Sequence, residues 1–513
     1  MSRLRRCRPL LHLACAYGLA SIGVFAVSLT ARAQEAVPGE YIIVLREDAM
    51  NVADVSAMSA GERKSVLADL AENLLPKRGA EITRTFRLVN AVGVRVPVDQ
   101  DRPPEEMRVE VQATLNDDVE LIEPNYLFYQ DDEATDAGEV DPRLSDLWYL
   151  ERIHAPEAWE IRNESPTVVV AVVDTGVFMD HEDLQGNIWT NQIEAAGAPG
   201  EDDDGNGFVD DIHGVDFFND DSDPSPDFVT RPNGQKEFEA HGTHVSGTIG
   251  AVANSVGIVG ISRRVKIMPL KFLGGSRGSG STTDALAAID YAVLNGARII
   301  NNSWGGGGAS VALQRAIERA NSAGVLFTAA AGNGGFDGIG DDNDGSPHFP
   351  SSYDVPNILA VAATGVSEAD PLTVFSNFGT SSVDLSAPGQ RILSAIPAGA
   401  DPSQPTSGYA FFNGTSMATP IVTGSAALLM AEYPSLNHLA IRQLMLETVD
   451  PVPLLTGKVA SGGRLNLARA MRPTAPAPAG SEAPVAMNAD DPLENVSAVF
   501  RPAFTAAVQE KSD

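Results

Sequence analysis

Cysteine is almost absent from this chain of 513 residues. The only two cysteines, Cys7 and Cys15, both lie within residues 1–33. If this segment is removed, the remaining protein can form no disulfide and has no cysteine nucleophile. Additional stability must then come from the size of the hydrophobic core or from a bound metal ion.

Positive charge is also scarce. The chain has 36 Lys and Arg residues against 68 Asp and Glu residues, which gives a formal net charge of −32 at pH 7. A surface this acidic argues against nucleic acid and anionic membranes as partners. It favours solubility and the binding of cations.

Residues 1–33 have the pattern of a signal peptide. Four arginines precede an apolar run from Leu10 to Leu29, and Ala31-Arg32-Ala33 follows with small residues at both positions that a signal peptidase reads. The alternative is an uncleaved anchor helix, because the run is nearly long enough to span a bilayer. The small-residue site favours cleavage. We therefore expect export to the cell exterior or the periplasm, without stable membrane insertion.

Residues 38–130 predict a small α+β domain with a βαββαβ-like order. Apolar runs indicate strands, and helical spacing of leucine and valine indicates two helices at 66–74 and 103–115. Residues 131–140 are acidic and lack large apolar side chains, so we expect an exposed processing linker. Residues 472–513 begin with a Pro/Ala-rich run and are expected to form a disordered tail.

Residues 141–471 form the large unit of the chain. Buried strands are expected at 168–173, 267–270, 297–300, 325–330 and 358–363, and helices near 283–295, 309–323 and 416–432. Apolar β-branched strands that alternate with helices are typical of an α/β fold. The prediction is a doubly wound parallel sheet that is covered by helices on both faces.

Two residues at the ends of such elements are candidates for catalysis. Asp174 follows six apolar residues, at the carboxyl end of a strand, where open α/β sheets place their sites. On its own, Asp174 could equally be a turn or helix-cap residue. His241 begins His241-Gly242-Thr243-His244, and two histidines at this spacing could also bind a metal ion. The chain has no His-Glu-x-x-His pattern, which weakens the zinc interpretation.

Two further residues have a suitable position for acyl transfer. Ser416 lies in Asn413-Gly414-Thr415-Ser416 at the start of a long apolar helix, where unpaired N–H groups and the helix dipole stabilise negative charge. It could alternatively be a helix N-cap. Asn333 ends the run Ala329-Ala330-Ala331-Gly332, and its amide could donate to an oxyanion or could serve a turn.

Together these motifs resemble the subtilase family of serine proteases, which has the triad order Asp, His, Ser. The resemblance covers residues 141–471. It implies that Asp174 orients the imidazole, that His241 is the general base and then acid, and that Ser416 is the nucleophile. It further implies that Asn333 and the Ser416 N–H form the oxyanion hole.

The resemblance extends to the substrate cleft and the N-terminal domain. Ser303, Trp304 and Gly305 match the family strand that walls the cleft and can pair with an extended peptide. Residues 38–130 resemble the inhibitor-type propeptide, which implies a ferredoxin-like domain that blocks the cleft until removed. The chain is therefore expected to be a secreted endopeptidase, made as a self-processed zymogen. Its partners would be peptide and protein substrates and its own propeptide, and the protein would be a monomer.

An acidic loop at residues 202–210 fits the template of a calcium-binding loop. The expected ligands are Asp202, Asp204, Asn206, the carbonyl of Phe208, and Asp210. The template asks for a bidentate Glu at position twelve, but His213 stands there, so Asp211 or Asp216 would have to substitute. A structural calcium ion is the predicted cofactor, and a solvated acidic loop is the alternative.

Two other classes of function compete with the protease. A catalytically silent binding protein on the same fold would not need the intact set Asp174, His241, Asn333 and Ser416. An α/β-hydrolase esterase would need Gly-x-Ser-x-Gly and the order Ser, Asp, His. Ala418 occupies the second glycine position of that motif, and the order differs.

Overall fold

A computed structural model describes residues 35–45, 81–86, 89, 91–96, 119–130, 133–135, 144–306, 308–335 and 337–473. The expected signal peptide, the helices expected at 66–74 and 103–115, and the C-terminal tail from residue 474 lie outside this part of the chain. Within it, no helix is both long and apolar enough to cross a membrane.

A mostly parallel sheet of nine strands organises the large unit. The strand order is β19 (Asp450–Pro451), β20 (Gly463–Arg464), β16 (Leu385–Pro388), β15 (Ile358–Thr364), β14 (Leu326–Ala330), β12 (Ile299–Asn302), β6 (Val169–Asp174), β10 (Lys266–Lys271) and β7 (Val215–Asp216). All neighbours pair in parallel except the antiparallel edge pair β19 and β20. The five strands that the sequence predicts are thus confirmed, with one antiparallel addition at the edge.

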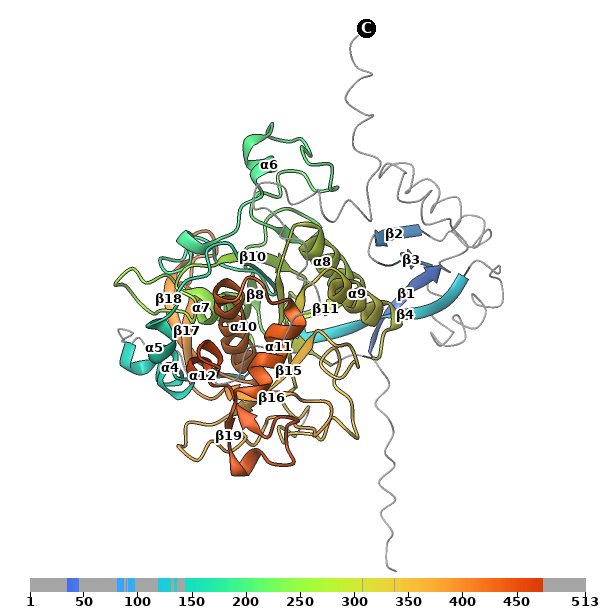
Figure 1. Cartoon of the computed structure of the whole chain (residues 1–513). Coiled ribbons are helices and arrows are strands. Elements are labelled where there is room, and N and C mark those ends of the chain that lie inside the picture. The colour runs from blue at the N-terminus through green and yellow to red at the C-terminus, as the bar shows by residue number, and fades with distance from the viewer. Residues whose placement is uncertain are drawn as a thin grey trace, which may run out of the picture. The chain divides into compact units, whose positions relative to one another are not determined.

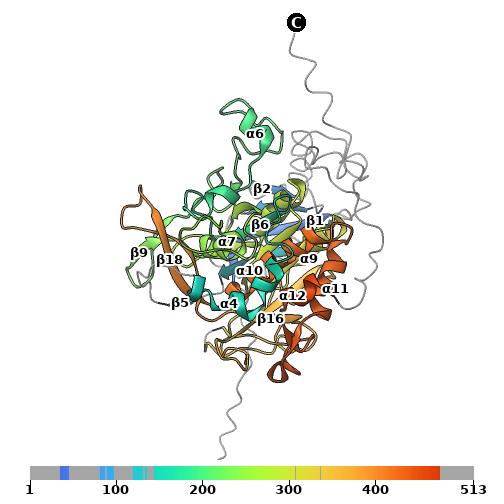
Figure 2. The same ribbon diagram turned by 60° about the vertical axis from the view of Figure 1, so that its left-hand side comes forward.

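Helices cover both faces of this sheet, and alternate residues of β6 show how. Val170 and Val172 belong to the same core as α7 (His241–Gly250) and α10 (Thr415–Glu432). Ala171 and Val173 belong to the core beneath α8 (Thr282–Leu294) and α9 (Val311–Ser322). Because successive side chains of a strand point to opposite faces, both faces must be apolar, as the sequence shows. Figures 1 and 2 show α7 and α10 side by side.

Shorter elements complete the large unit. They are the helices α4 (Trp148–Arg152), α5 (Ala155–Trp159), α6 (Gln192–Ala196), α11 (His438–Glu447) and α12 (Leu467–Met471) and the antiparallel pairs β8 (Phe228–Thr230) with β9 (Lys236–Phe238) and β17 (Ile392–Ala398) with β18 (Thr406–Asn413). The hairpin of β8 and β9 leads directly into α7, which carries the first candidate catalytic motif.

The N-terminal region contributes an antiparallel sheet. Its strands are β1 (Ala36–Leu45), β2 (Glu81–Phe86), β3 (Ala91–Arg95) and β4 (Val119–Gln130), in the order β4-β1-β3-β2. Ile42, Val44 and Phe86 pack into the same core as α8 and α9. The strands thus agree with an α+β domain, while its ferredoxin-like arrangement stays a prediction because the helices lie outside the described residues.

The end of β4 leaves this sheet and runs into the large unit. It pairs antiparallel with β11 (Ser279–Ser281) on one side and β13 (Trp304–Gly305) on the other. After two residues the chain forms β5 (Glu133–Thr135), which pairs with β18. These three residues lie within the expected processing linker, where the sequence did not predict a strand. The backbone N–H and C=O groups of an edge strand can pair with any extended segment, whatever its side chains.

Candidate active site

Asp174 and His241 are joined directly. Asp174 is the last residue of β6, and His241 is the first residue of α7. Nδ1 of His241 lies 2.7 Å from Oδ1 of Asp174, and both residues are at most 1% exposed. The same carboxylate oxygen accepts the N–H of Thr175 at 2.7 Å. The carboxylate holds the imidazole in the tautomer with Nδ1 protonated, so Nε2 can act as a base.

Ser416 lies in the first turn of α10, which packs against α7. Its hydroxyl donates to the carbonyl of Ser303 at 2.9 Å, and the hydroxyl of Ser303 donates to the carbonyl of Ser416 at 2.9 Å. This reciprocal pair fixes the nucleophile candidate beside the strand that contains Trp304 and Gly305. The N–H groups of the first helical turn favour negative charge at this point.

Asn333 follows β14 and is tied to the residue before Ser416. Its Oδ1 accepts the N–H and the hydroxyl of Thr415, both at 3.0 Å. The Thr415 hydroxyl also accepts the N–H of Gly332 at 3.1 Å. Because Thr415 binds Oδ1, the orientation of the Asn333 amide is fixed. Its NH2 group is the type of donor that an oxyanion needs.

The end of β4 occupies the position of an extended peptide between β11 and β13. Gln130 pairs with Trp304, and Tyr129 pairs with Gly305 and with Ser279. Phe128 is fully buried, with its ring 5.1 Å from that of Trp304, which in turn lies 4.7 Å from Phe272. The chain therefore places its own segment where the sequence predicts that substrate binds, and its aromatic side chain fills an apolar site there.

Side chains of β4 also cap two helices of the large unit. The carboxylate of Glu123 accepts the hydroxyl of Ser310 at 2.5 Å and the N–H groups of Val311 and Ala312 at 2.8 and 3.1 Å. Burial raises the pKa of Glu123, while these hydrogen bonds oppose the shift. At the start of α8, Asn125 accepts the N–H of Thr283 and donates to its hydroxyl, both at 3.0 Å. These contacts satisfy helix N–H groups that otherwise lack a partner.

A buried ion pair lies next to the Asp174–His241 pair and was not predicted. Nζ of Lys271 lies 2.5 Å from Glu239, and both side chains are at most 1% exposed. Lys271 also donates to the carbonyl of Thr175, directly after Asp174, at 3.3 Å. Burial raises the pKa of Glu239 to about 7, and the charge of Lys271 opposes this shift. Neither residue lies in a recognisable motif. The pairing of β10 with β6 brings Lys271 to the site, and Glu239 stands two residues before His241.

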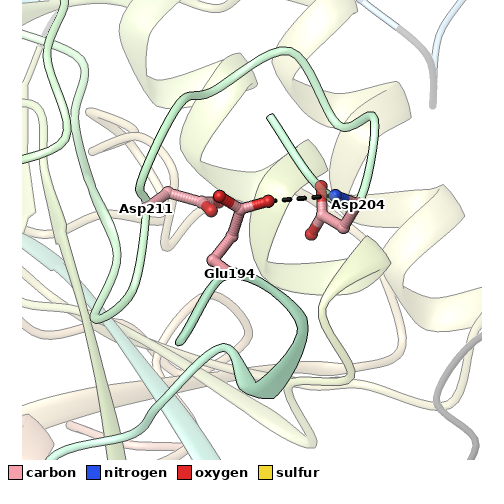
Figure 3. A group of neighbouring side chains, drawn as sticks. All are labelled: Glu194, Asp204 and Asp211. Carbon is pink, nitrogen blue, oxygen red and sulfur yellow. Dashed lines mark hydrogen bonds between the residues drawn. The ribbon is translucent and has the colours of Figure 1, made fainter. Parts of the chain in front are cut away.

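The acidic loop gathers a different set of residues from the one predicted. Glu194, Asp204 and Asp211 point toward one another, and their nearest oxygens lie within 4.8 Å of each other (Figure 3). Of the five predicted ligands, only Asp204 belongs to this group, together with Asp211, which the sequence offered as a substitute at position twelve. Asp202 instead accepts the N–H groups of Asn206 and Gly207, and Asp210 accepts that of Gly200. The Asn206 amide donates to Asp204 and Asp211, and Phe208 packs against aromatic rings.

The group suits a hard cation such as calcium. Glu194 and Asp211 are at least nine-tenths buried, and within the described ranges no Lys, Arg or His forms an ion pair with any of the three. Burial raises the pKa of Asp204 and of Asp211, and neighbouring carboxylates add to both shifts. Clustered carboxylate oxygens are the donors that calcium prefers. The sequence did not reveal Glu194, because α6 brings it in from outside the loop.

Comparisons with known proteins agree with this geometry. A model described as the subtilase family matches residues 165–473. Thermitase from Thermoactinomyces vulgaris is 35% identical over 334 residues, which cover 65% of this chain and 98% of thermitase. Subtilisin J from Geobacillus stearothermophilus is 27% identical over 422 residues, covering 82% of this chain and 88% of that protein.

Other relatives are longer than this chain. Subtilisin-like protease 1 from Plasmodium vivax is 31% identical over 337 residues, and the match spans 50% of its length. The crystal structure of fervidolysin from Fervidobacterium pennivorans, a keratinolytic enzyme related to subtilisin, has a similar fold. Its TM-score is 0.64 at 23% identity, over 87% of this chain and 62% of fervidolysin.

Proposed function

This chain belongs to the subtilase family, and from that premise we propose that it is an exported serine endopeptidase with Asp174, His241 and Ser416 as its triad. The observation that carries the proposal is the buried 2.7 Å contact between His241 and Asp174, with the helix that has Ser416 in its first turn packed against the helix of His241. A serine hydroxyl is a poor nucleophile until a base takes its proton, and a base needs a carboxylate to fix its tautomer.

The proposed reaction is acyl transfer in two stages. His241 takes the hydroxyl proton of Ser416 as the oxygen attacks the peptide carbonyl carbon. The amide of Asn333 and the N–H of Ser416 stabilise the oxyanion. His241 then gives the proton to the leaving amine, and a water molecule that His241 deprotonates hydrolyses the acyl-enzyme. Asp174 remains ionised and stabilises the imidazolium form of His241.

We further propose that the chain is a zymogen that cuts itself between Gln130 and Glu133. Gln130 pairs with Trp304, and the next residue back along that strand, Ser303, accepts the hydroxyl of Ser416 through its carbonyl. On the far side, Glu133 pairs with Asn413, three residues before Ser416. We propose that the two residues between these pairings pass Ser416 in the precursor.

The released N-terminal part would then act as an inhibitor. Its strand β4 remains paired with β11 and β13 after the cut, so a substrate cannot add its own strand there. The helix caps of Glu123 and Asn125 strengthen this association. Cleavage of the segment by another protease is the competing route, since an acidic linker is open to many enzymes.

A structural calcium ion is proposed at Glu194, Asp204 and Asp211, in place of the full predicted loop set. This ion would be important for stability once residues 1–33 are removed, because the processed protein then has no cysteine that could form a disulfide. When bound, calcium would neutralise three clustered carboxylates and hold α6 to the loop that follows it. We also propose that the processed enzyme is a monomer that acts on peptide and protein substrates.

A fluorophosphonate probe tests the proposed function. The probe should label the processed enzyme on Ser416, and Ser416→Ala should remove the label. Ser425→Ala is the control, because Ser425 lies in the same helix and donates only to the carbonyl of Ile421. Labelling that persists in Ser416→Ala, or that depends on Ser425, would refute the assignment.

A further inference from the structure

His348 lies against two glycines at the substrate strand. A Cβ atom at Gly305 would stand 2.0 Å from Cε1 of His348, and one at Gly332 would stand 2.8 Å from Cδ2. No side chain could occupy either position while the ring is there. The ring therefore covers Gly305, which pairs with Tyr129, and Gly332, which precedes the oxyanion candidate Asn333.

The backbone holds His348 in this place. Gly306 donates to the carbonyl of Phe349 at 3.0 Å, which joins the strand end to the loop of His348. The N–H of His348 donates to the hydroxyl of Ser352 at 3.0 Å, and its carbonyl accepts the hydroxyl of Ser351 at 2.8 Å. These bonds fix the backbone of His348, and Nδ1 of its ring lies 3.4 Å from the hydroxyl oxygen of Ser351, so the imidazole has a defined place beside Gly305.

The pairing register shows which substrate side chain meets this ring. Directly paired residues of an antiparallel ladder direct their side chains to the same face. The face of the ladder on which a side chain at Gly305 would point is the face that His348 covers. The peptide residue paired with Gly305, and the peptide residue two positions after it, therefore direct their side chains to this same face. A peptide that continues the register of β4 places this later residue opposite Ser303, whose carbonyl accepts Ser416. It is the residue immediately before the bond that Ser416 would attack.

An imidazole offers an N–H donor, and as the cation it also offers a positive charge. Both favour a carboxylate and leave an aliphatic side chain without a partner. The chain has a net charge of −32, so its general surface repels acidic peptides and selection of an acidic residue must be local. The residues that follow Gln130 in the chain itself are Asp131, Asp132 and Glu133, so its first substrate would be acidic at this point.

We propose that His348 is a specificity-determining residue that selects an acidic side chain, aspartate above all, immediately before the cleaved bond. This inference rests on the proposed endopeptidase activity. It names a substrate class for that activity, namely peptides with an aromatic residue four positions before the bond and an acid directly before it. Phe128 in its aromatic surroundings is the model for the first feature.

A peptide series tests the inference with the full-length chain after processing. Fluorogenic peptides of the sequence Phe-Tyr-Gln-X should differ only in X, as Asp, Asn, Leu or Lys. The wild type is expected to prefer Asp to its isostere Asn by about ten- to hundredfold in kcat/KM, the range of a hydrogen bond to a charged group. His348→Gln should reduce this ratio to about one, and His348→Glu should reverse the preference toward Lys.

The control is His154→Asn, because His154 contacts Glu157 and Asp450 and has a left-handed backbone that Asn tolerates. It should keep the wild-type ratio. If the wild type cuts the Leu peptide and does not distinguish Asp from Asn, the inference about His348 is overturned while the protease assignment stands. If no peptide is cut and Ser416 takes no fluorophosphonate, the proposed function itself fails.

Discussion

Lys271 and Glu239 form a buried ion pair, and burial changes the chemistry of the Glu239 carboxyl group. Both lie inside the protein: Lys271 is paired directly with Asp174 in the sheet, and Glu239 stands two residues before His241. Asp227 lies 3.4 Å from Lys271, and the charge of Lys271 also acts on Asp216, whose pKa burial raises to about 6. The group is a small buried network in which one cation, Lys271, faces several carboxylates, so removal of Lys271 would leave these carboxylates without a counter-charge.

The pH dependence of stability can be worked out from Glu239. Its pKa rises from 4.5 to about 7 on folding, so between these values the folded state holds a proton that the unfolded state has lost. The free energy of unfolding must then fall as the pH rises through this window. Glu239→Gln, which resembles the protonated form, should match the parent near pH 5. It should be more stable than the parent near pH 8 by an amount on the order of 2 kcal/mol.

Chemical unfolding of the inactive Ser416→Ala precursor at pH 5 and pH 8, with and without Glu239→Gln, measures this difference. Because Asp216 and Asp284 also have raised pKa values, the difference between variant and parent is the decisive quantity. The opposite result would be a parent that becomes more stable than Glu239→Gln as the pH rises. It would show that the ion pair with Lys271 stabilises the charged carboxylate more than burial destabilises it.

At the scale of single elements, β4 explains how the N-terminal region is held. One end of the strand lies in its own sheet, its middle caps α8 and α9, and its last residues lie between β11 and β13. Glu123 contributes most to the caps, since it is 6% exposed and satisfies three donors. Exposed charges on the same strand contribute less, because water competes for them.

Glu123→Gln should therefore loosen the N-terminal part after processing. The substitution removes the negative charge at the start of α9. The NH2 group of the new glutamine would also face a helix N–H group, so that two donors meet without an acceptor. We expect a loss of about 1–3 kcal/mol, which shortens the delay before activity appears by roughly five- to hundredfold. The measurement is the time course of peptide cleavage after the full-length precursor is processed.

The matched control for that experiment is Glu120→Gln. Glu120 pairs with Arg315 at the surface, where ion pairs contribute about 0.2–1 kcal/mol. Its delay should change by less than about fivefold. Equal delays in Glu123→Gln and the wild type would mean that the cap on α9 does not hold the inhibitor.

The acidic loop makes a separate prediction about metal removal. With calcium at about a hundred times its Kd, binding adds about 2.7 kcal/mol to the stability of the folded state, and a chelator removes it. Glu194→Gln should abolish most of this calcium-dependent shift in the melting temperature. Asp202→Asn should keep it, because Asp202 accepts only loop N–H groups from Asn206 and Gly207. Equal shifts in the wild type and Glu194→Gln would exclude this group as the site.

The elements differ in how far the sequence predicts them. Buried strands such as 168–173 are apolar on both faces, so their place in a parallel sheet follows from composition alone. Asp174, His241 and Ser416 stand at the ends of such elements in family motifs, and their positions could be predicted. Glu194, Lys271 and His348 could not, because each reaches its site only through tertiary packing and lies in no periodic pattern.

At the scale of the whole molecule, the nine-stranded sheet and its two helix layers depend on contacts between distant parts of the chain. Parallel strands pair residues that are distant in sequence, so such a sheet forms slowly and benefits from a partner that is present during folding. The N-terminal sheet shares a core with α8 and α9, which makes it part of the folded precursor. The pairings of Gln130 with Trp304 and of Glu133 with Asn413 are the contacts on which the proposed self-cleavage rests.

The central claim is that Ser416 cuts the chain that carries it. The most direct measurement is the intact mass, with N-terminal sequencing, of the protein secreted by a host that lacks other extracellular proteases. We predict two fragments for the wild type, with the new N-terminus between residues 131 and 133, and an uncut chain from the signal-peptide site onward for Ser416→Ala. A Ser416→Ala protein that is processed at the same bond would contradict the account.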